Sequence, residues 1–357
     1  MITVSLCMIV KNEEEHLPHC LRSVQSLVDE IIIVDTGSTD NTKEIAAAFG
    51  AKIYDFVWRD DFSAARNFSF SKATQEYCMW LDADDVFSDD DRNAFLRMKG
   101  ELPTDTDVVM LRYHTAFDAT GRPTFSYWRE RLLRRSRGFR FEGAVHEAIT
   151  PRGKIYYGDA AVSHRKTKPG DPDRNLLIYE KLRESGKAFS PREQFYYARE
   201  LMYHARYGEA AAVFSAFLDE GRGWIENNLE ACRNLAFCRK QTGDTEGEFA
   251  ALTRALRYAP PRAELCCDLG HFFFEKGDLT NAVFWYEAAL KDTAEATGGG
   301  FSLPDCRGVI PLLQLCVCYY HLGDRDRAEK YNEAVGKLNP NHASYLYNKA
   351  FFSAPAP

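Results

Sequence analysis

The chain has 357 residues, of which 45% are apolar and 27% charged, and its formal net charge is −7 at pH 7. This length suits two globular domains, and the acidic balance argues against nucleic-acid binding, which needs a basic surface. No basic-then-apolar leader opens the chain, and no apolar run approaches the roughly 20 residues that span a bilayer. We therefore expect a cytoplasmic protein with at most peripheral membrane contact.

The first half alternates short β-rich runs with helical patterns. Strands are predicted at residues 3–10, 30–34, 52–57 and 77–81, and helices at 16–28, 41–49 and 63–73. This βαβαβαβ order predicts a largely parallel, doubly wound, Rossmann-like α/β sheet. Ligands of such sheets bind beyond the carboxyl ends of the strands. The stretch from about 108 to 164 is strand-rich and predicts a mixed extension of the sheet.

The second half is helical and repetitive. Gly208, Gly243 and Gly277 recur at intervals of 35 and 34 residues, and Gly323 follows after 46, the excess lying in a glycine-rich insertion around 297–304. A period near 34 with small and aromatic residues at matching offsets indicates tetratricopeptide-like pairs of helices. We expect a sheet domain at residues 1–168, a linker or helix at 169–190 and an all-α repeat domain at 191–350.

Two carboxylates follow the fourth predicted strand. Asp82 and Asp84 are two residues apart, so in an extended chain their side chains point the same way. Such a pair at a strand end suits a hard divalent cation, Mn²⁺ or Mg²⁺, that also takes diphosphate oxygens as ligands. A solvated acidic turn is the alternative, since the run 88–91 adds three more acidic residues.

Four segments together resemble the family 2 glycosyltransferases of GT-A fold: residues 11–14 (KNEE), 34–40 (VDTGSTD), 65–67 (ARN) and 81–85 (LDADD). The resemblance implies a donor that is a UDP-sugar or another nucleotide sugar. It places Asn12 in the donor site, Asp35 near the base or ribose and Arg66 near the base or phosphates. It also implies that Asp82 lies toward the ribose and metal and that Asp84 binds the metal. Without it, Asp35 could merely end a strand and Arg66 could be a solvated helix residue.

The segment FEGAVHE at 141–147 resembles one found in members of that family with tetratricopeptide tails, including the sublancin-type peptide S-glycosyltransferases. The resemblance implies that Glu147 is the catalytic base and that His146 orients it or meets the donor. Glu142 is the nearest alternative base. His164 ends another predicted strand, and its position resembles that of the late histidine that completes the metal shell in GT-A enzymes. Six arginines between 129 and 140 fit either diphosphate neutralisation or a solvated hairpin.

These patterns together predict an inverting, metal-dependent transferase that moves a sugar from a UDP-sugar to a peptide or protein side chain. Repeat arrays present extended concave surfaces, so we expect the helical domain to hold the acceptor. One alternative is transfer onto a cell-envelope or lipopolysaccharide glycan. Another is a tetratricopeptide scaffold with an inactive transferase domain.

Overall fold

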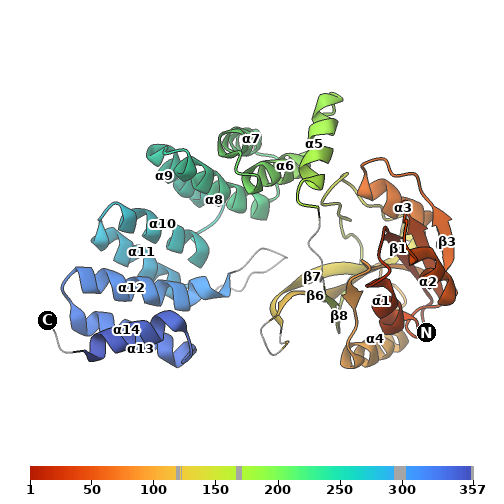
Figure 1. Cartoon of the computed structure of the whole chain (residues 1–357), viewed down its shortest axis with the longest axis horizontal. Helices are drawn as coiled ribbons and strands as arrows, with labels where there is room; N and C mark the ends of the chain where they lie inside the picture. Colours follow the sequence, from red (N-terminus) through yellow and green to blue (C-terminus); the bar gives the residue numbers. More distant parts are fainter. Residues whose placement is uncertain (118–120, 122, 166–170, 293–302, 355–357) are drawn as a thin grey trace. The chain divides into compact units, whose positions relative to one another are not determined.

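The computed structural model describes residues 1–117, 121, 123–165, 171–292 and 303–354 (Figure 1). Most of the expected insertion at 297–304 lies outside these residues. The chain forms two compact units, Met1–Lys187 and Ala188–Pro357. The sequence-based boundaries at 168 and 190 stay a prediction. No helix within the described residues has the length and apolar composition needed to cross a bilayer.

The first unit is built on one eight-stranded sheet in the order β3-β2-β1-β4-β7-β6-β8-β5. Its strands are β1 (Val4–Val10), β2 (Glu30–Asp35), β3 (Lys52–Asp55), β4 (Tyr77–Trp80), β5 (Asp85–Val86), β6 (Val108–Phe117), β7 (Pro123–Arg134) and β8 (Ile155–His164). The first four strands are parallel to one another. Strand β7 is antiparallel to β4 and β6, β8 is parallel to β6, and β5 is antiparallel to β8. The prediction of a mostly parallel sheet with a mixed extension is confirmed.

Helices cover both faces of this sheet (Figure 1). They are α1 (Leu17–Val24), α2 (Thr42–Ala48), α3 (Phe62–Lys72) and α4 (Asp89–Glu101), whereas α5 (Arg174–Glu184) stands away from the sheet. Side chains of β1 alternate, so Leu6 and Met8 join the core with α1 and α4, while Cys7 packs with residues of α3 on the other face. Because helices lie on both faces, every residue of β2 is buried, and its sequence is a continuous apolar run between Glu30 and Asp35.

The acidic run at residues 88–91 is not a solvated turn. It forms the start of α4. Ser88 caps this helix, since its Oγ accepts a hydrogen bond from the amide of Asp91. Asp89, Asp90 and Asp91 form the first helical turn, where negative charge complements the helix dipole. The cap and the dipole therefore account for these aspartates, and they lend no support to an acidic turn at residues 82–85.

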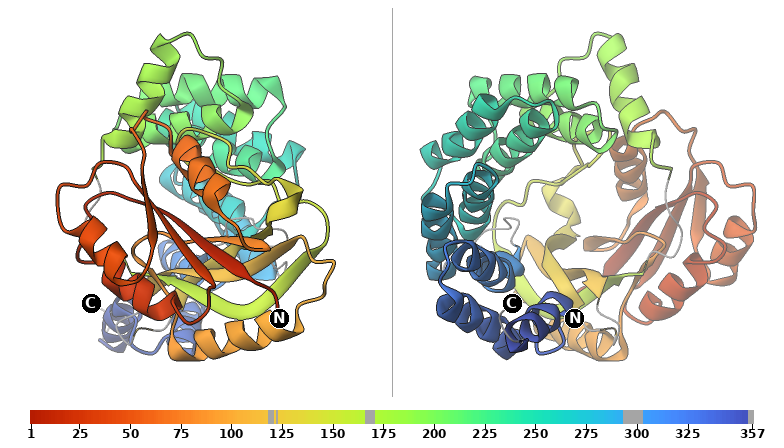
Figure 2. Two further views of the ribbon diagram at one scale, coloured as in Figure 1. Left: turned by 90° about the vertical axis from the view of Figure 1, so that its right-hand side faces the viewer. Right: turned by 60° about the vertical axis from the view of Figure 1, so that its left-hand side comes forward.

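The second unit consists of helices that pack in antiparallel pairs. They are α6 (Pro191–Tyr203), α7 (Tyr207–Glu220), α8 (Ile225–Gln241), α9 (Thr245–Arg254), α10 (Ala263–Glu275), α11 (Leu279–Lys291), α12 (Val309–His321), α13 (Arg325–Leu338) and α14 (Ala343–Ser353). Within this unit the helices follow one another along a curved array, coloured green to blue in Figure 2. The expected helical repeat region is confirmed.

One glycine of the expected repeat is out of register. Gly243, Gly277 and Gly323 each lie in the turn of a helix pair with φ between +75° and +81°, a conformation that favours glycine. Each precedes an aspartate that caps the second helix. Gly208 instead lies inside α7, and the first turn uses Ala205 at φ +56°. The structural equivalent of the three turn glycines is Ala205. Gly208 falls three residues after it, which is close enough for the spacing alone to suggest Gly208 as a repeat position.

Candidate active site

The predicted carboxylates follow β4 at the carboxyl edge of the parallel strands. Asp82, Asp84 and Asp85 lie in the turn after Trp80, and their contacts differ. The Oδ1 of Asp82 accepts a hydrogen bond from Arg66, whereas Asp84 and Asp85 approach His164 at the end of β8. Strand β5 begins at Asp85 and pairs with β8, with Asp85 opposite His164. This pairing brings residues from two distant parts of the chain together.

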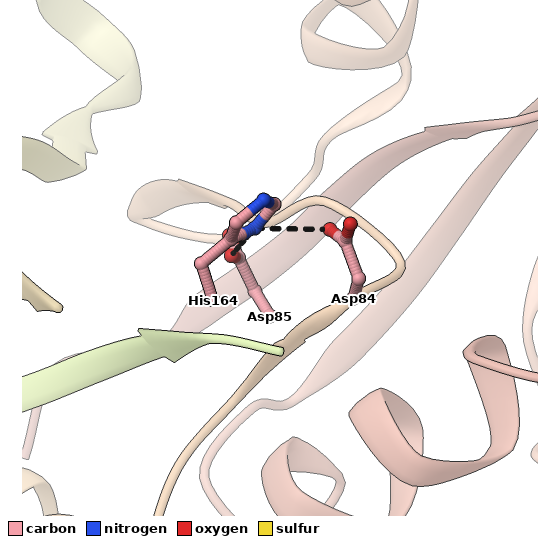
Figure 3. Close-up of side chains that lie close together, drawn as sticks. All are labelled: Asp84, Asp85 and His164. Carbon is pink, nitrogen blue, oxygen red and sulfur yellow. Dashed lines mark hydrogen bonds and ion pairs between the residues drawn. The ribbon is translucent and has the colours of Figure 1, made fainter. Parts of the chain in front are cut away.

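Asp84, Asp85 and His164 form a group that could hold a metal ion (Figure 3). One ligand atom from each lies within 4.8 Å of the others. The Nδ1 atom of His164 is 3.3 Å from Oδ1 of Asp84 and 3.3 Å from Oδ1 of Asp85. Hydrogen bonding to Asp84 and Asp85 raises the pKa of His164 to about 10. Two carboxylates and one imidazole are a fitting donor set for a divalent cation, which would take the place of the Nδ1 proton.

Asp85 was not among the residues predicted from the sequence. Its side chain is fully buried, and Oδ2 forms an ion pair of 3.1 Å with Arg131, which is also fully buried. Its Oδ1 accepts a hydrogen bond from the hydroxyl of Tyr113 at 2.9 Å. These contacts fix the orientation of Asp85 beside His164, whereas Asp84 retains partial exposure. The burial of Arg131 also shows that this arginine does not belong to a solvated hairpin.

Arg66 connects Asp82, the first carboxylate after β4, to the predicted base Glu147. Its Nη2 donates to Oδ1 of Asp82 at 2.7 Å, and its Nε donates to Oε1 of Glu147 at 2.6 Å. Its guanidinium lies 4.9 Å from the ring centre of Trp80 and 5.4 Å from that of Phe141. Burial opposes the charged form of Asp82, but the neighbouring Arg66 outweighs it and lowers the pKa of Asp82 to about 2. The Nη1 atom of Arg66 is buried and has no hydrogen-bond partner among the described residues.

Hydrogen bonds hold both ends of the segment 141–148, which carries Glu147. Glu142 and Ala148 exchange two backbone hydrogen bonds, at 2.9 and 3.1 Å. The side-chain amide of Asn67 makes two hydrogen bonds to the backbone of Phe141. Its Nδ2 donates to the carbonyl at 2.9 Å, and its Oδ1 accepts from the N–H at 2.8 Å. His146 has φ +53°, a backbone conformation that is uncommon outside glycine. Glu142 is exposed, whereas Glu147 turns toward Arg66, so the structure separates the two carboxylates proposed as base.

Asp35 is the last residue of β2, and Asn12 lies in the loop that follows β1. The Oδ1 of Asp35 accepts hydrogen bonds from the amides of Gly37 and Ser38, both at 2.9 Å. The residue is only 1% exposed, and its buried Oδ2 accepts no hydrogen bond from any residue that the structure describes. The Oδ1 of Asn12 accepts from the amide of Thr39 at 2.8 Å, which joins this loop to the one that follows β2. Asn12 has φ +56°, so its side chain and backbone both shape this corner.

The fold and the site define a class of protein: an α/β domain with carboxylates beyond its parallel strands, joined to a helical repeat array. Comparison with known families specifies it further. Residues 5–156 match the family described as Glycosyl transferase family 2, and residues 263–291, which are α10 and α11, match a tetratricopeptide repeat. The N-terminal unit is therefore a family 2 glycosyltransferase domain, and tetratricopeptide repeats follow it.

Three curated relatives extend this result. A TPR repeat-containing protein of Synechococcus elongatus is 29% identical over 83% of this chain and 68% of its own length. The glycosyltransferase SunS of Bacillus subtilis is 29% identical over 56% of this chain and 49% of SunS. The lipopolysaccharide core biosynthesis glycosyltransferase LpsC of Rhizobium meliloti is 27% identical over 43% of this chain and 59% of LpsC. The chain thus spans only about half the length of SunS and LpsC.

Proposed function

We propose that the chain is an inverting, metal-dependent glycosyltransferase that moves a sugar from a UDP-sugar to a side chain of a peptide or protein. The contact of Arg66 with both Glu147 and Asp82 carries this proposal, because it joins the candidate base to the predicted donor and metal residues. The similarity to SunS and the resemblance of the segment 141–147 to sublancin-type peptide S-glycosyltransferases support the class of acceptor.

The donor end of the proposal is supported by two buried polar atoms that have no hydrogen-bond partner in the described part of the chain. Oδ2 of Asp35 is an acceptor that would be satisfied by an N–H of the base or a ribose hydroxyl. Nη1 of Arg66 is a charged donor that would be satisfied by a phosphate oxygen. Leaving either atom without a hydrogen bond costs free energy, on the order of 1–3 kcal/mol. A bound nucleotide diphosphate would recover that cost at both positions.

The metal end rests on the chemistry of the side chains after β4. Asp84 and His164 would hold a Mn²⁺ or Mg²⁺ ion, with a further carboxylate oxygen from Asp82 or Asp85. When bound, the ion supplies positive charge that stabilises the departing diphosphate. Asp85 is held more rigidly than Asp84, because Arg131 and Tyr113 already contact both of its carboxylate oxygens. In this arrangement Asp85 mainly orients His164.

Glu147 is the proposed base. Arg66 engages its Oε1, so Oε2 is the oxygen that would take the proton from the acceptor's nucleophile during attack. Hydrogen bonds from Asn67 and between Glu142 and Ala148 hold the backbone of the loop that carries it. Inversion follows when the acceptor attacks the anomeric carbon from the side opposite the diphosphate. We also propose that the repeat unit holds the acceptor peptide, as its array of helix pairs suits an extended partner.

The test is a panel of UDP-sugars, each mixed with the full chain, Mn²⁺ and candidate peptides, with release of UDP as the readout. Asp84→Asn should abolish metal-dependent release and metal-dependent UDP binding by calorimetry. Asp90→Asn, an equal change in the exposed first turn of α4, is the matched control and should behave like the unaltered chain. If no donor yields UDP and Asp84→Asn leaves UDP binding unchanged, the proposal is wrong.

The similarity to LpsC favours one second candidate, transfer onto a lipopolysaccharide core sugar. The same assay separates the two when lipopolysaccharide core acceptors are added beside the peptides. Transfer to the glycan and to no peptide would replace the first proposal. A scaffold function of the repeats alone predicts normal partner binding by an Asp84→Asn chain without any UDP release.

A further inference from the structure

A cavity of about 270 Å³ opens on the α3 side of the sheet, away from the candidate active site. Asn67 and Phe70 of α3 form one wall, and Cys78 of β4 and Leu133 of β7 form the floor. Cys78 lies near the amino end of β4, whereas Asp82 and Asp84 follow its carboxyl end. The cavity and the carboxylates are therefore at different ends of the same strand.

The interior of this cavity is apolar and its rim is cationic. Phe70, Leu133 and Phe139 supply apolar surface, and Arg134, Arg135 and Arg140 also line it. Arg134 is committed to the fold, because it donates to the carbonyl of Thr106 and the hydroxyl of Tyr77. Arg140 is exposed and has neither a hydrogen bond nor an ion pair with any described residue. None of the described lining residues is acidic. Arg134 pairs with Glu76 and Asp107, whereas Arg135 and Arg140 form no ion pair with any described residue.

We propose that this cavity binds a small amphiphilic anion: an aromatic or branched apolar body with one carboxylate, sulfonate or phosphate group. The apolar body would lie against Phe70, Leu133 and Phe139, and the anionic group would meet Arg135 and Arg140 at the rim. Drug-sized ligands occupy pockets of roughly 300–1,000 Å³, so a single ring system with a short substituent is the size that fits. A long lipid chain would extend beyond the cavity.

The same cavity adjoins the loop that carries Glu147. Asn67 forms part of the cavity wall, and its amide makes both hydrogen bonds to the backbone of Phe141. Phe70 packs edge-on against Phe141, with ring centres 5.3 Å apart. A ligand packed on this wall restricts Asn67 and Phe70 and so steadies the segment 141–148. The cavity is thus an allosteric site as well as a binding site.

Fluorescence titration of the full chain with 8-anilinonaphthalene-1-sulfonate tests the binding site, with near-ultraviolet circular dichroism to verify the native state. We expect saturable binding that Arg140→Gln weakens about fivefold, the size of one partly exposed ion pair. Ser71→Trp, which blocks the cavity from its exposed edge, should abolish it. Arg97→Gln, an equal charge change on α4 at the other face of the sheet, should leave the affinity unchanged.

Hydrogen exchange of the same complex tests the link to the loop. Saturating probe should slow exchange of the Phe141 and Ala148 amides at least twofold in the native chain and not in Ser71→Trp. Absence of saturable binding, or affinity that neither Arg140→Gln nor Ser71→Trp reduces, would overturn the proposed site. Binding without any change in exchange at 141–148 would overturn the allosteric role. Neither readout depends on catalysis, so the result stands apart from the proposed function.

Discussion

Arg66 and Glu147 are 81 positions apart in the chain, yet Nε of Arg66 donates to Oε1 of Glu147 at 2.6 Å. The same guanidinium holds Asp82 at 2.7 Å, and both contacts are largely buried. A single cation therefore balances two carboxylates before any ligand arrives. A phosphate oxygen at Nη1 would be a third anionic partner for the same guanidinium, bound beside Glu147 and Asp82 without displacing either.

Arg66→Lys should reduce the turnover of UDP release by about two orders of magnitude, because an ammonium keeps the charge but cannot reproduce the planar, forked donor geometry. The free energy of unfolding should fall less than in Arg66→Ala, where the largely buried Glu147 and the partly exposed Asp82 would lose their counter-ion at a cost of about 2–3 kcal/mol. Arg59→Lys, at an exposed position before α3, is the control. Turnover within threefold of the unaltered chain would contradict the role given to Arg66.

Glu147→Gln and Glu142→Gln separate the two candidate bases. Removing the base should lower the turnover of Glu147→Gln by about 10²–10⁴-fold. UDP affinity should stay within a few-fold, because the amide oxygen still accepts from Arg66. Glu142 is exposed, and its backbone rather than its side chain closes the loop, so Glu142→Gln should retain near-normal turnover. Steady-state kinetics with calorimetry of UDP binding measure both, and the reverse ranking would assign the base to Glu142.

Asp85 should contribute mainly to stability, and Asp84 mainly to metal-dependent UDP binding. Asp85→Asn breaks a fully buried ion pair with Arg131 and should lower the free energy of unfolding by about 3 kcal/mol. Asp84→Asn should change stability by less than about 0.5 kcal/mol but remove metal-dependent UDP binding. Urea unfolding and calorimetry with and without Mn²⁺ distinguish the two effects. Equal destabilisation by both variants would show that Asp84 too is mainly structural.

The central strands β1, β2 and β4 could be predicted because they are buried on both faces and are therefore apolar runs between turn residues. Helix α4 was missed because its first turn, Asp89 to Asp91, was interpreted as an acidic turn rather than as a capped helix start. The pairing of Asp85 with His164 depends on β5 and β8 meeting, which no local pattern encodes. The same holds for Arg66 and Glu147. The family resemblance named the residues, but only the fold shows which of them touch.

Glu30 should make the stability of the first unit depend on pH. Burial alone would raise its pKa, but hydrogen bonds from Lys52, Ser5 and Thr74 lower it from 4.5 to about 2. A depressed carboxyl pKa contributes stability that is present above pH 4.5 and is lost as the pH falls toward 2. After allowance for the exposed Lys52 ammonium, this is about 2 kcal/mol.

The Glu30→Gln chain should therefore have a lower free energy of unfolding than the unaltered chain at pH 7. The difference between the two should shrink as the pH falls from 4.5 to 2. Urea unfolding followed by hydrogen exchange in β2 reports on this unit alone. Glu44→Gln, an exposed change on α2, is the control and should show no such trend. A deficit that stays constant down to pH 2 would mean that ionisation of Glu30 does not matter to folding.

Alanine substitutions at two glycines of the repeat unit should have opposite signs. Gly277 has φ +75° in the turn between α10 and α11, so Gly277→Ala places a Cβ in the left-handed region and should destabilise the unit by about 1 kcal/mol. Gly208 lies within α7 with no atom within 4 Å of an added Cβ, so Gly208→Ala should stabilise the helix by up to about 1 kcal/mol. Thermal unfolding of the full chain measures both. Destabilisation of similar size at both sites would mean that Gly208 does occupy the turn position that its spacing suggests. Ala205→Gly provides an independent check, because a glycine at this positive φ should stabilise the first turn.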